Sequence, residues 1–177
     1  MEDSELLKKI AKGDSKSFAA LFEKYKSKVY GTCYYLVSDK ALAEDLSQET
    51  WIRVVKSAQD YQPIAPVISW ILRIARNACY NELRSRNRWV DLDGEEEQQV
   101  PHDQLSVEEI LGNFEDESRL KEAIIKLPPQ QKMALMLVIQ EEKSHSEVAQ
   151  EMSCSVGAIK VLLFRARESL RRRLEES

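Results

Sequence analysis

The chain has 177 residues, enough for one medium-sized domain or two small ones. A hydrophobic content of 43% with 32% charged residues supports a packed core and excludes a wholly disordered chain. Five glycines and five prolines leave long uninterrupted stretches, which favours helices over a turn-rich sheet protein. No apolar run approaches the roughly 20 residues of a membrane span, and the acidic start of the chain lacks a signal-peptide pattern. We therefore expect a cytoplasmic protein without membrane insertion.

The net charge of −4 is distributed very unevenly along the chain. Residues 1–90 contain 15 basic and 11 acidic residues, and residues 119–177 contain 11 basic and 8 acidic residues. Residues 91–118 contain 11 acidic residues and no lysine or arginine. This pattern predicts two mildly basic domains, residues 1–90 and 119–177, joined by an acidic linker whose carboxylates repel one another. Within that linker, a short helix is expected near residues 107–111.

The first block predicts four helices. A short helix ends near Gly13, and a long amphipathic helix covers the apolar positions from Phe18 to Leu36, which recur at i, i+3, i+4 and i+7. A third helix begins at Asp39 and runs to about Ala58. Two prolines, at positions 63 and 66, separate it from a fourth helix over residues 67–89.

The second block also predicts four helices, at about residues 118–127, 129–141, 144–152 and 155–174. Pro129 suits a first helical turn, and Ser144 with Glu147 forms a capping box at the start of the third helix. Ser155 is expected to cap the fourth. Because about three residues join the last two helices, they have the spacing of a helix-turn-helix.

The residues that usually carry catalysis or metal binding do not form a site in this sequence. Cys33, Cys79 and Cys154 lie far apart in the sequence without CxxC spacing, so we expect free thiols and neither disulfides nor a metal site. His145 stands between two serines, but sequence neighbours on a helix do not face each other as a catalytic triad requires. Without a glycine-rich phosphate loop or an HExxH motif, we expect no enzyme activity and no cofactor.

Three helix faces carry information beyond core packing. The last helix has an apolar stripe for the core, whereas its other side combines small, apolar and basic residues as in a recognition helix: Gly157, Ala158, Lys160, Val161, Phe164, Arg165, Arg167 and Glu168. The helix after Pro66 has a basic face interleaved with Asn, Tyr and Trp, suited to strand binding and base stacking: Arg73, Arg76, Asn77, Tyr80, Arg84, Arg86, Arg88 and Trp89. The helix after Asp39 has a polar stripe interrupted by one apolar residue: Asp45, Gln48, Glu49, Ile52 and Lys56. Each face also has a plain interpretation as a solvated surface.

Several segments resemble the extracytoplasmic-function (ECF) bacterial RNA polymerase sigma factors, in the family's order and spacing. Residues 43–54 (AEDLSQETWIRV) resemble the helix that binds core polymerase, and residues 69–77 (SWILRIARN) look like the promoter-melting helix. Residues 127–131 (LPPQQ), 144–149 (SHSEVA), 156–160 (VGAIK) and 164–167 (FRAR) are similar to the C-terminal domain of that family. The resemblance extends over nearly the whole chain.

The resemblance implies an all-α fold with a four-helix N-terminal domain and a C-terminal helix-turn-helix domain, and it implies roles for individual residues. Asp45, Leu46, Gln48, Glu49 and Ile52 are expected to bind the β′ subunit of RNA polymerase core. Arg73, Arg76, Asn77, Tyr80, Arg84, Arg86 and Arg88 are expected to bind the minus-ten element, with Asn77 and the loop 59–67 holding a flipped base. Gly157, Lys160, Val161, Phe164, Arg165 and Arg167 are expected to read the minus-thirty-five element.

The resemblance also implies partners. The second domain of the family binds the β flap, the linker passes through or near the RNA exit channel, and most members are inhibited by an anti-sigma factor. We expect a monomer when the chain is free of these partners.

The sequence departs from the family pattern mainly in the recognition helix. Ala158, Val161 and Leu162 stand where the family favours polar or charged residues, and Lys143 and Asn81 replace a usual leucine and aspartate. These departures predict weak binding to the minus-thirty-five element, with apolar contacts to thymine methyl groups replacing part of the polar readout.

Two other classes of protein remain open from the residues alone. The first is a stand-alone helix-turn-helix regulator with an N-terminal sensor or dimerisation domain. Such a regulator has no need of the stripe that begins at Asp45. The second is an enzyme such as a nuclease, which no carboxylate cluster on a rigid element supports.

Overall fold

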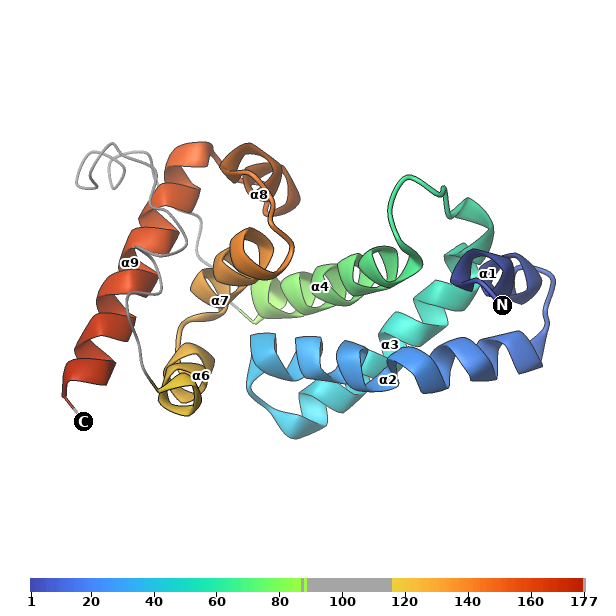
Figure 1. Cartoon of the computed structure of the whole chain (residues 1–177), viewed down its shortest axis with the longest axis horizontal. Coiled ribbons are helices and arrows are strands. Elements are labelled where there is room, and N and C mark those ends of the chain that lie inside the picture. Colours follow the sequence, from blue (N-terminus) through green and yellow to red (C-terminus); the bar gives the residue numbers. More distant parts are fainter. Residues whose placement is uncertain (87, 89–115, 177) are drawn as a thin grey trace. The chain divides into compact units, whose positions relative to one another are not determined.

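The computed structural model of the chain describes residues 1–86, 88 and 116–176. Within these residues every regular element is helical, and the chain divides into two compact units, Met1–Arg86 and Asn87–Ser177 (Figure 1). The all-α, two-domain fold expected from the sequence is confirmed. The acidic segment and the short helix expected at residues 107–111 lie outside the described residues.

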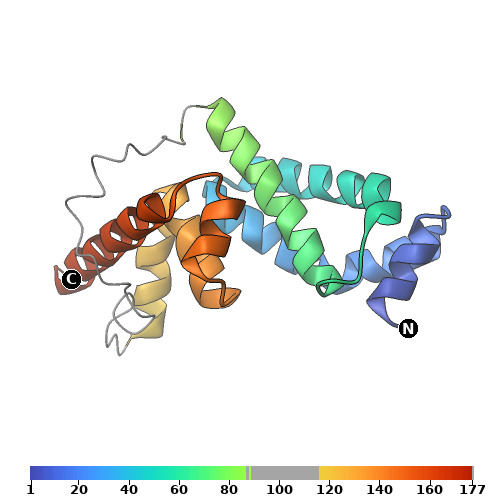
Figure 2. The same ribbon diagram turned by 90° about the horizontal axis from the view of Figure 1, so that it is seen from above.

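The first unit is a bundle of four helices. They are α1 (Asp3–Ile10), α2 (Ser15–Val37), α3 (Lys40–Ser57) and α4 (Val67–Ser85), with a 3₁₀ turn, η1 (Ala58–Asp60), after α3. The long helix α2 packs against the other three, and Figure 2 shows α4 crossing α2 and α3 obliquely. The apolar stripe predicted for α2 is buried, from Leu21 through Val29 and Cys33 to Leu36.

Local backbone and side-chain groups define the end of α2 and the start of α3. The carboxylate of Asp39 accepts a hydrogen bond from the backbone N–H of Leu42 at 3.0 Å, so α3 begins where the sequence predicted. Ser38 adopts a left-handed conformation with φ of 54° and closes α2, which lets the chain reverse within two residues.

The helix α4 is shorter than predicted. It ends at Ser85 and Arg86 is its C-cap, whereas the sequence pattern suggested a helix as far as residue 89. Leu83 is the last buried residue of α4, and Arg84, Ser85 and Arg86 after it are exposed, so no side chain at the end of the helix holds it against the core.

The second unit is built around the C-terminal helix. The helices α6 (Glu117–Ile125), α7 (Pro129–Leu135) and α8 (His145–Glu151) all pack against α9 (Val156–Glu175). The single helix predicted over residues 129–141 is an α-helix that continues into a π-helical segment, η3 (Met136–Gln140). Because α6 begins at Glu117 behind the capping residue Asp116, the last residues assigned to the acidic linker belong to this helix instead.

The helix-turn-helix has the capping residues that the sequence predicted. Ser144 accepts a hydrogen bond from the N–H of Glu147 at 3.2 Å, and Ser155 accepts one from the N–H of Ala158 at 3.0 Å. Between the two helices, Ser153 has φ of 53° and the N–H of Cys154 donates to the carbonyl oxygen of Ala149 at 3.0 Å. These contacts set the turn that positions α9.

The three cysteines are free thiols, as expected, but two of them meet inside the first unit. A hydrogen bond from Cys79 lowers the pKa of the Cys33 thiol, whereas the same contact and burial raise the pKa of Cys79. Both side chains are fully buried. Among the described residues, no cluster of three His, Cys, Asp or Glu side chains could hold a metal ion, and no helix is long and apolar enough to span a membrane.

Replacing Asp39 by alanine removes the cap of α3 and should lower the free energy of unfolding of the first unit by about 1 kcal/mol. Asp39→Ser, which keeps an oxygen acceptor, should restore most of this loss. Trp51 and Trp70 lie in this unit and residues 116–176 contain no tryptophan, so urea denaturation followed by tryptophan fluorescence reports on it. Equal destabilisation by alanine and serine would contradict the capping role.

Candidate protein and nucleic-acid interfaces

The outer face of α3 combines charge with exposed apolar surface. Asp45 and Gln48 are exposed, and Ile52 retains 55% of its accessible surface. Glu49 is half-buried, and its carboxylate forms an ion pair with Arg53 one turn later. Since the opposite face of α3 is buried, the outer face has no role in the core of the first unit and is available to a partner.

Two residues on α3 differ from the sequence-based expectation. Leu46, expected to contact polymerase, is only 3% exposed and packs in the core beside Leu42 and Thr50, so it cannot be a direct contact. Conversely, Val55 was not singled out, yet it is 43% exposed and lies one turn after Ile52. The adjacent Val54 is fully buried, and the helical repeat turns Val55 away from it towards the side of Ile52.

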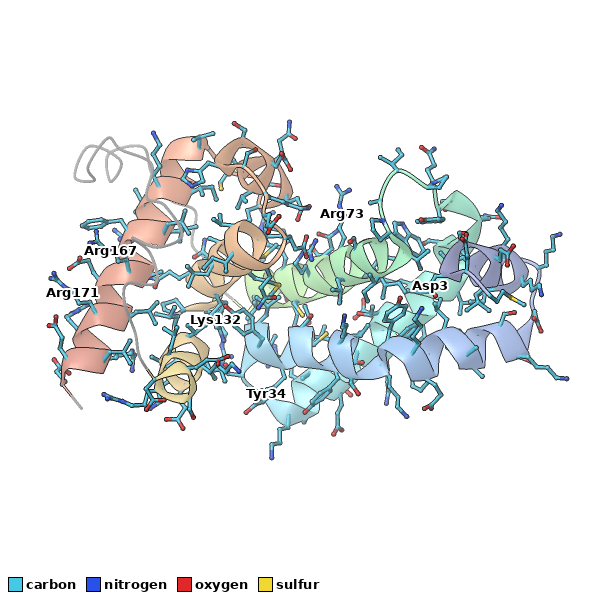
Figure 3. The ribbon with its side chains drawn as sticks, in the orientation of Figure 1. Asp3, Tyr34, Arg73, Lys132, Arg167 and Arg171 are labelled. Atoms are coloured by element: carbon cyan, nitrogen blue, oxygen red, sulfur yellow. The ribbon has the colours of Figure 1, made fainter. Side chains whose placement is uncertain are left out.

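The outer face of α4 presents a row of polar and basic groups. Arg73, Asn77 and Arg84 are exposed, and Figure 3 shows Arg73 projecting from α4 away from α2. Tyr80 is half-buried, and its hydroxyl accepts a hydrogen bond from Arg84 at 3.2 Å. These groups offer both cationic and aromatic contacts, the combination that single-stranded nucleic acids require.

The other arginines in and just after α4 differ in their exposure to solvent. Arg76 is 1% exposed, which corrects its assignment to the exposed strand-binding face. Arg76 lies between the exposed Arg73 and the buried Cys79 and Leu83 on the helix surface, and its side chain is buried with the latter two. Arg86 is exposed and donates from Nε to Glu82 at 2.6 Å, and Arg88 is also exposed.

The loop that joins η1 to α4 is held by its own contacts. The Tyr61 hydroxyl donates to the carbonyl oxygen of Ala65 at 2.7 Å, and the Tyr61 ring packs edge-on against Trp70 with 5.6 Å between ring centroids. Ile64, at the tip, is 87% exposed. The loop borders an open cavity of about 550 Å³, whose other wall is formed by the start of α1 and by Lys24 of α2.

The C-terminal helix α9 exposes fewer of the expected residues than its sequence suggested. Arg165 is exposed, and Lys160, Phe164 and Arg167 are partly exposed. Gly157 and Val161, however, are buried, which corrects their assignment to the DNA-facing surface. Neither side chain carries a polar atom, so burying them costs no desolvation of polar groups.

The other two apolar residues of α9 that depart from the family pattern are also buried. Ala158 is 5% and Leu162 is 4% exposed. Leu162 therefore lies in the interior, and the expectation that exposed apolar residues replace polar readout of the DNA loses its main support. The partly or fully exposed residues Lys160, Phe164, Arg167 and Arg171 recur at i, i+4, i+7 and i+11, so they share one face of α9, and Figure 3 labels the last two of them.

Two basic side chains of the second unit are strongly influenced by burial. Lys132 of α7 is 1% exposed and donates to the carbonyl oxygen of Ile125 at 3.2 Å, and burial lowers its pKa to about 8. Burial and the nearby Lys160 lower the pKa of His145.

Comparison with known families identifies both units. Residues 21–89 match the family Sigma-70 region 2, and residues 117–170 match Sigma-70, region 4. The chain is 31% identical to the ECF RNA polymerase sigma factor SigM of Bacillus subtilis over 85% of this chain and 91% of that protein. The chain belongs to the ECF family of RNA polymerase sigma factors. It is also 28% identical to the ECF sigma factor SigW of Bacillus subtilis, over 96% of this chain and 95% of SigW.

Two solved structures of protein complexes contain a chain with a similar fold. One is CnrH in complex with the cytosolic domain of CnrY, with a TM-score of 0.58 at 19% identity over 99% of this chain and 98% of that one. Another is the sigma factor RpoE with the anti-sigma factor NepR from Bartonella quintana, with a TM-score of 0.58 at 24% identity over 90% and 98% of the two chains. At these identities the likeness shows the fold alone.

Membership of the ECF family decides between the classes that the residues alone left open. Sigma factors are non-enzymatic, so this chain has no catalytic activity of its own. Most of the first unit matches sigma region 2, which a stand-alone helix-turn-helix regulator would not contain.

Replacing Lys132 by methionine should change how the stability of the ECF protein depends on pH. The folded chain, with a Lys132 pKa of about 8, binds fewer protons between pH 8 and the unfolded pKa of 10.5 than the unfolded chain does. Lys132 therefore makes stability rise with pH in that window, by at most about 1.4 kcal/mol per pH unit.

The measurement is the difference in unfolding free energy between wild type and Lys132→Met, followed by circular dichroism between pH 7.5 and 10. The difference should favour methionine at the lower pH and shrink as the pH rises. If the difference in unfolding free energy does not change with pH, the pKa of Lys132 is not lowered in the folded chain.

Proposed function

We propose that this ECF sigma factor binds the β′ subunit of RNA polymerase core through the outer face of α3. The proposal is carried by one observation: α3 has a complete core face and still exposes Ile52 and Val55 among polar residues. An apolar centre with a polar rim is the usual composition of a protein-binding patch. Asp45, Gln48 and Glu49 form that rim.

The outer face of α4 and the loop 61–66 are proposed to bind the non-template strand of the minus-ten element. Arg73 and Arg84 supply charge for the phosphates, and Tyr80 supplies an aromatic ring. The exposed amide of Asn77 has both a donor and an acceptor, which is what reading a base edge requires.

In the second unit, α9 is proposed to bind the minus-thirty-five element through Lys160, Phe164, Arg165 and Arg167. All four retain accessible surface in a helix whose N-terminus is capped by Ser155, as in a recognition helix. Region 4 is further proposed to contact the β flap, as the family resemblance implies.

The proposed regulation and location follow from the relatives. CnrH and RpoE were solved bound to CnrY and to the anti-sigma factor NepR, and we propose that this chain is likewise inhibited by an anti-sigma factor. Polymerase and promoter place its activity in the cytoplasm, where we expect the free chain to be a monomer. The segment 91–118, with 11 acidic residues, is proposed to pass near the RNA exit channel, where its charge would mimic RNA.

Two exposed isoleucines provide a reciprocal test of the polymerase and DNA surfaces. Ile52→Asp places a charge in the centre of the α3 patch and should weaken binding to core polymerase at least tenfold, because central apolar contacts of an interface contribute more than about 1 kcal/mol. Ile64→Asp, on the loop, should leave core binding unchanged and weaken binding of single-stranded DNA. Surface plasmon resonance with immobilised core measures the first effect, and fluorescence anisotropy measures the second. Loss of core binding in both variants would contradict the assignment.

Asn77→Ala should flatten a preference for one base at one position of the minus-ten strand, since removing a base-reading group costs about 1–3 kcal/mol at that position. Arg84→Ala, on the same face, should weaken binding to every sequence alike and reduce the salt slope by about 0.7. The measurement is fluorescence anisotropy with single-stranded DNA selected from a random pool by the wild-type chain. If Asn77→Ala affects all sequences equally, Asn77 contacts only the backbone.

A further inference from the structure

Two cysteines meet in the core of the first unit where its three long helices pack together. The thiol of Cys79 on α4 donates a hydrogen bond to the sulfur of Cys33 on α2, and Thr50 of α3 makes a further hydrogen bond to Cys33. All three side chains are fully buried. Since α2, α3 and α4 each pack against the other two, this contact lies at the centre of the bundle.

The cysteine pair lies beneath both surfaces that are proposed to bind partners. Cys79 stands two residues after Asn77 on α4, and Thr50 directly follows Glu49 on α3. The charge of Glu49 reaches Cys79 and helps to raise the pKa of its thiol. A covalent change at this contact would therefore be felt on the outer faces of α3 and α4.

The two cysteines also lie near the ends of their helices. Cys33 is one turn before Val37, the last residue of α2, and Cys79 is one turn before Leu83, the last buried residue of α4. Figure 1 shows these two helix ends on the same side of the bundle. Because helix ends open locally at a lower free-energy cost than the rest of a domain, a molecule as small as hydrogen peroxide can reach the thiols without global unfolding.

We propose that hydrogen peroxide converts Cys33 and Cys79 into a reversible disulfide between α2 and α4, and that this disulfide weakens the binding of single-stranded DNA by α4. The effect on DNA rests on the proposed function of α4, whereas the formation of the disulfide does not. Unlike a lone buried cysteine, each of these thiols has the second sulfur that a disulfide requires already in contact.

The reaction needs only the pair of thiols and one molecule of peroxide. The hydrogen bond from Cys79 lowers the pKa of Cys33, whereas the pKa of Cys79 is raised, so Cys33 is the thiol that ionises first and attacks. Its sulfur bonds to one peroxide oxygen, the O–O bond breaks, and the other oxygen leaves as water with the proton of Cys33. The sulfur of Cys79 then attacks the resulting sulfenic acid, the S–O bond breaks, and a second water carries away the proton of Cys79. The thiols lose two electrons in total, which reduce the peroxide, and a small thiol reverses the disulfide by exchange.

Formation of the disulfide requires the helices to move. A disulfide holds its sulfur atoms about 2.05 Å apart, whereas atoms in non-bonded contact lie about 3.5–4.0 Å apart. Since the interior is close-packed, α4 shifts against α2 and α3 to accommodate the shorter distance. Arg73 and Asn77 move with α4, out of the arrangement in which they are proposed to hold the strand.

Mass spectrometry of the full-length chain after stoichiometric peroxide tests the disulfide. Tryptic digestion of the oxidised wild type should yield the peptides of Cys33 and Cys79 linked to each other, a result that does not depend on the folding of any variant. Cys154→Ser, which removes the third cysteine, should lose about 2 Da on oxidation, the mass of two hydrogen atoms, and regain it with dithiothreitol. Cys33→Ala and Cys79→Ala should show no such loss.

The effect on DNA is measured by fluorescence anisotropy with single-stranded DNA selected from a random pool by the reduced wild-type chain. Oxidation of Cys154→Ser should weaken binding severalfold, and dithiothreitol should restore it. Cys33→Ala is the matched control and should bind equally well before and after peroxide, with circular dichroism to check folding. Absence of the linked peptides, or unchanged binding by the disulfide-linked chain, would overturn the proposal. If the reduced chain binds no single-stranded DNA, the α4 assignment and the effect on binding fail together, and the linked peptides alone decide whether the disulfide forms.

Discussion

The packing of α4 against α2 and α3 is the contact on which the DNA-binding properties of the first unit depend. Ile71, Ala75 and Cys79 are fully buried, and the two small side chains let α4 lie close to its neighbours. Once this stripe faces the core, the helical repeat leaves Arg73 and Asn77 outside. The same repeat turns Arg76 towards the interior, although it stands next to Asn77 in the sequence.

The same bundle carries two surfaces of different chemistry. The outer face of α3 combines acidic groups with exposed Ile52 and Val55, whereas the outer face of α4 is basic and aromatic. Each surface lies on a helix whose opposite face is buried. Packing of that buried face therefore fixes the position of the helix and of the surface it carries. Because α3 and α4 pack directly against each other, the surfaces proposed for polymerase and for DNA belong to the same helical bundle.

In the second unit a single helix has to serve both the core and the DNA. The helices α6, α7 and α8 all pack on α9, and Ile159, Leu163 and Leu170 are fully buried. Because three helices cover most of the surface of α9, only a narrow polar face remains available to DNA. Val161 and Leu162 lie on the covered part, so they can be apolar without exposing apolar surface. The side chains available to the proposed minus-thirty-five contact are therefore the exposed or partly exposed ones, such as Lys160 and Arg165.

The sequence by itself determined the helices, their caps and the family, because apolar periodicity and capping residues such as Asp39 and Ser155 act within one or two turns. Only the tertiary structure decided which side chains at the edge of an apolar stripe are buried. Leu46, Arg76 and Val161 lie at such edges, where burial depends on the neighbouring helix. The contact of Cys33 with Cys79 and the cavity beside Lys24 also join residues far apart in the sequence. Local patterns contain no information about such pairings, because these arise only when the helices pack.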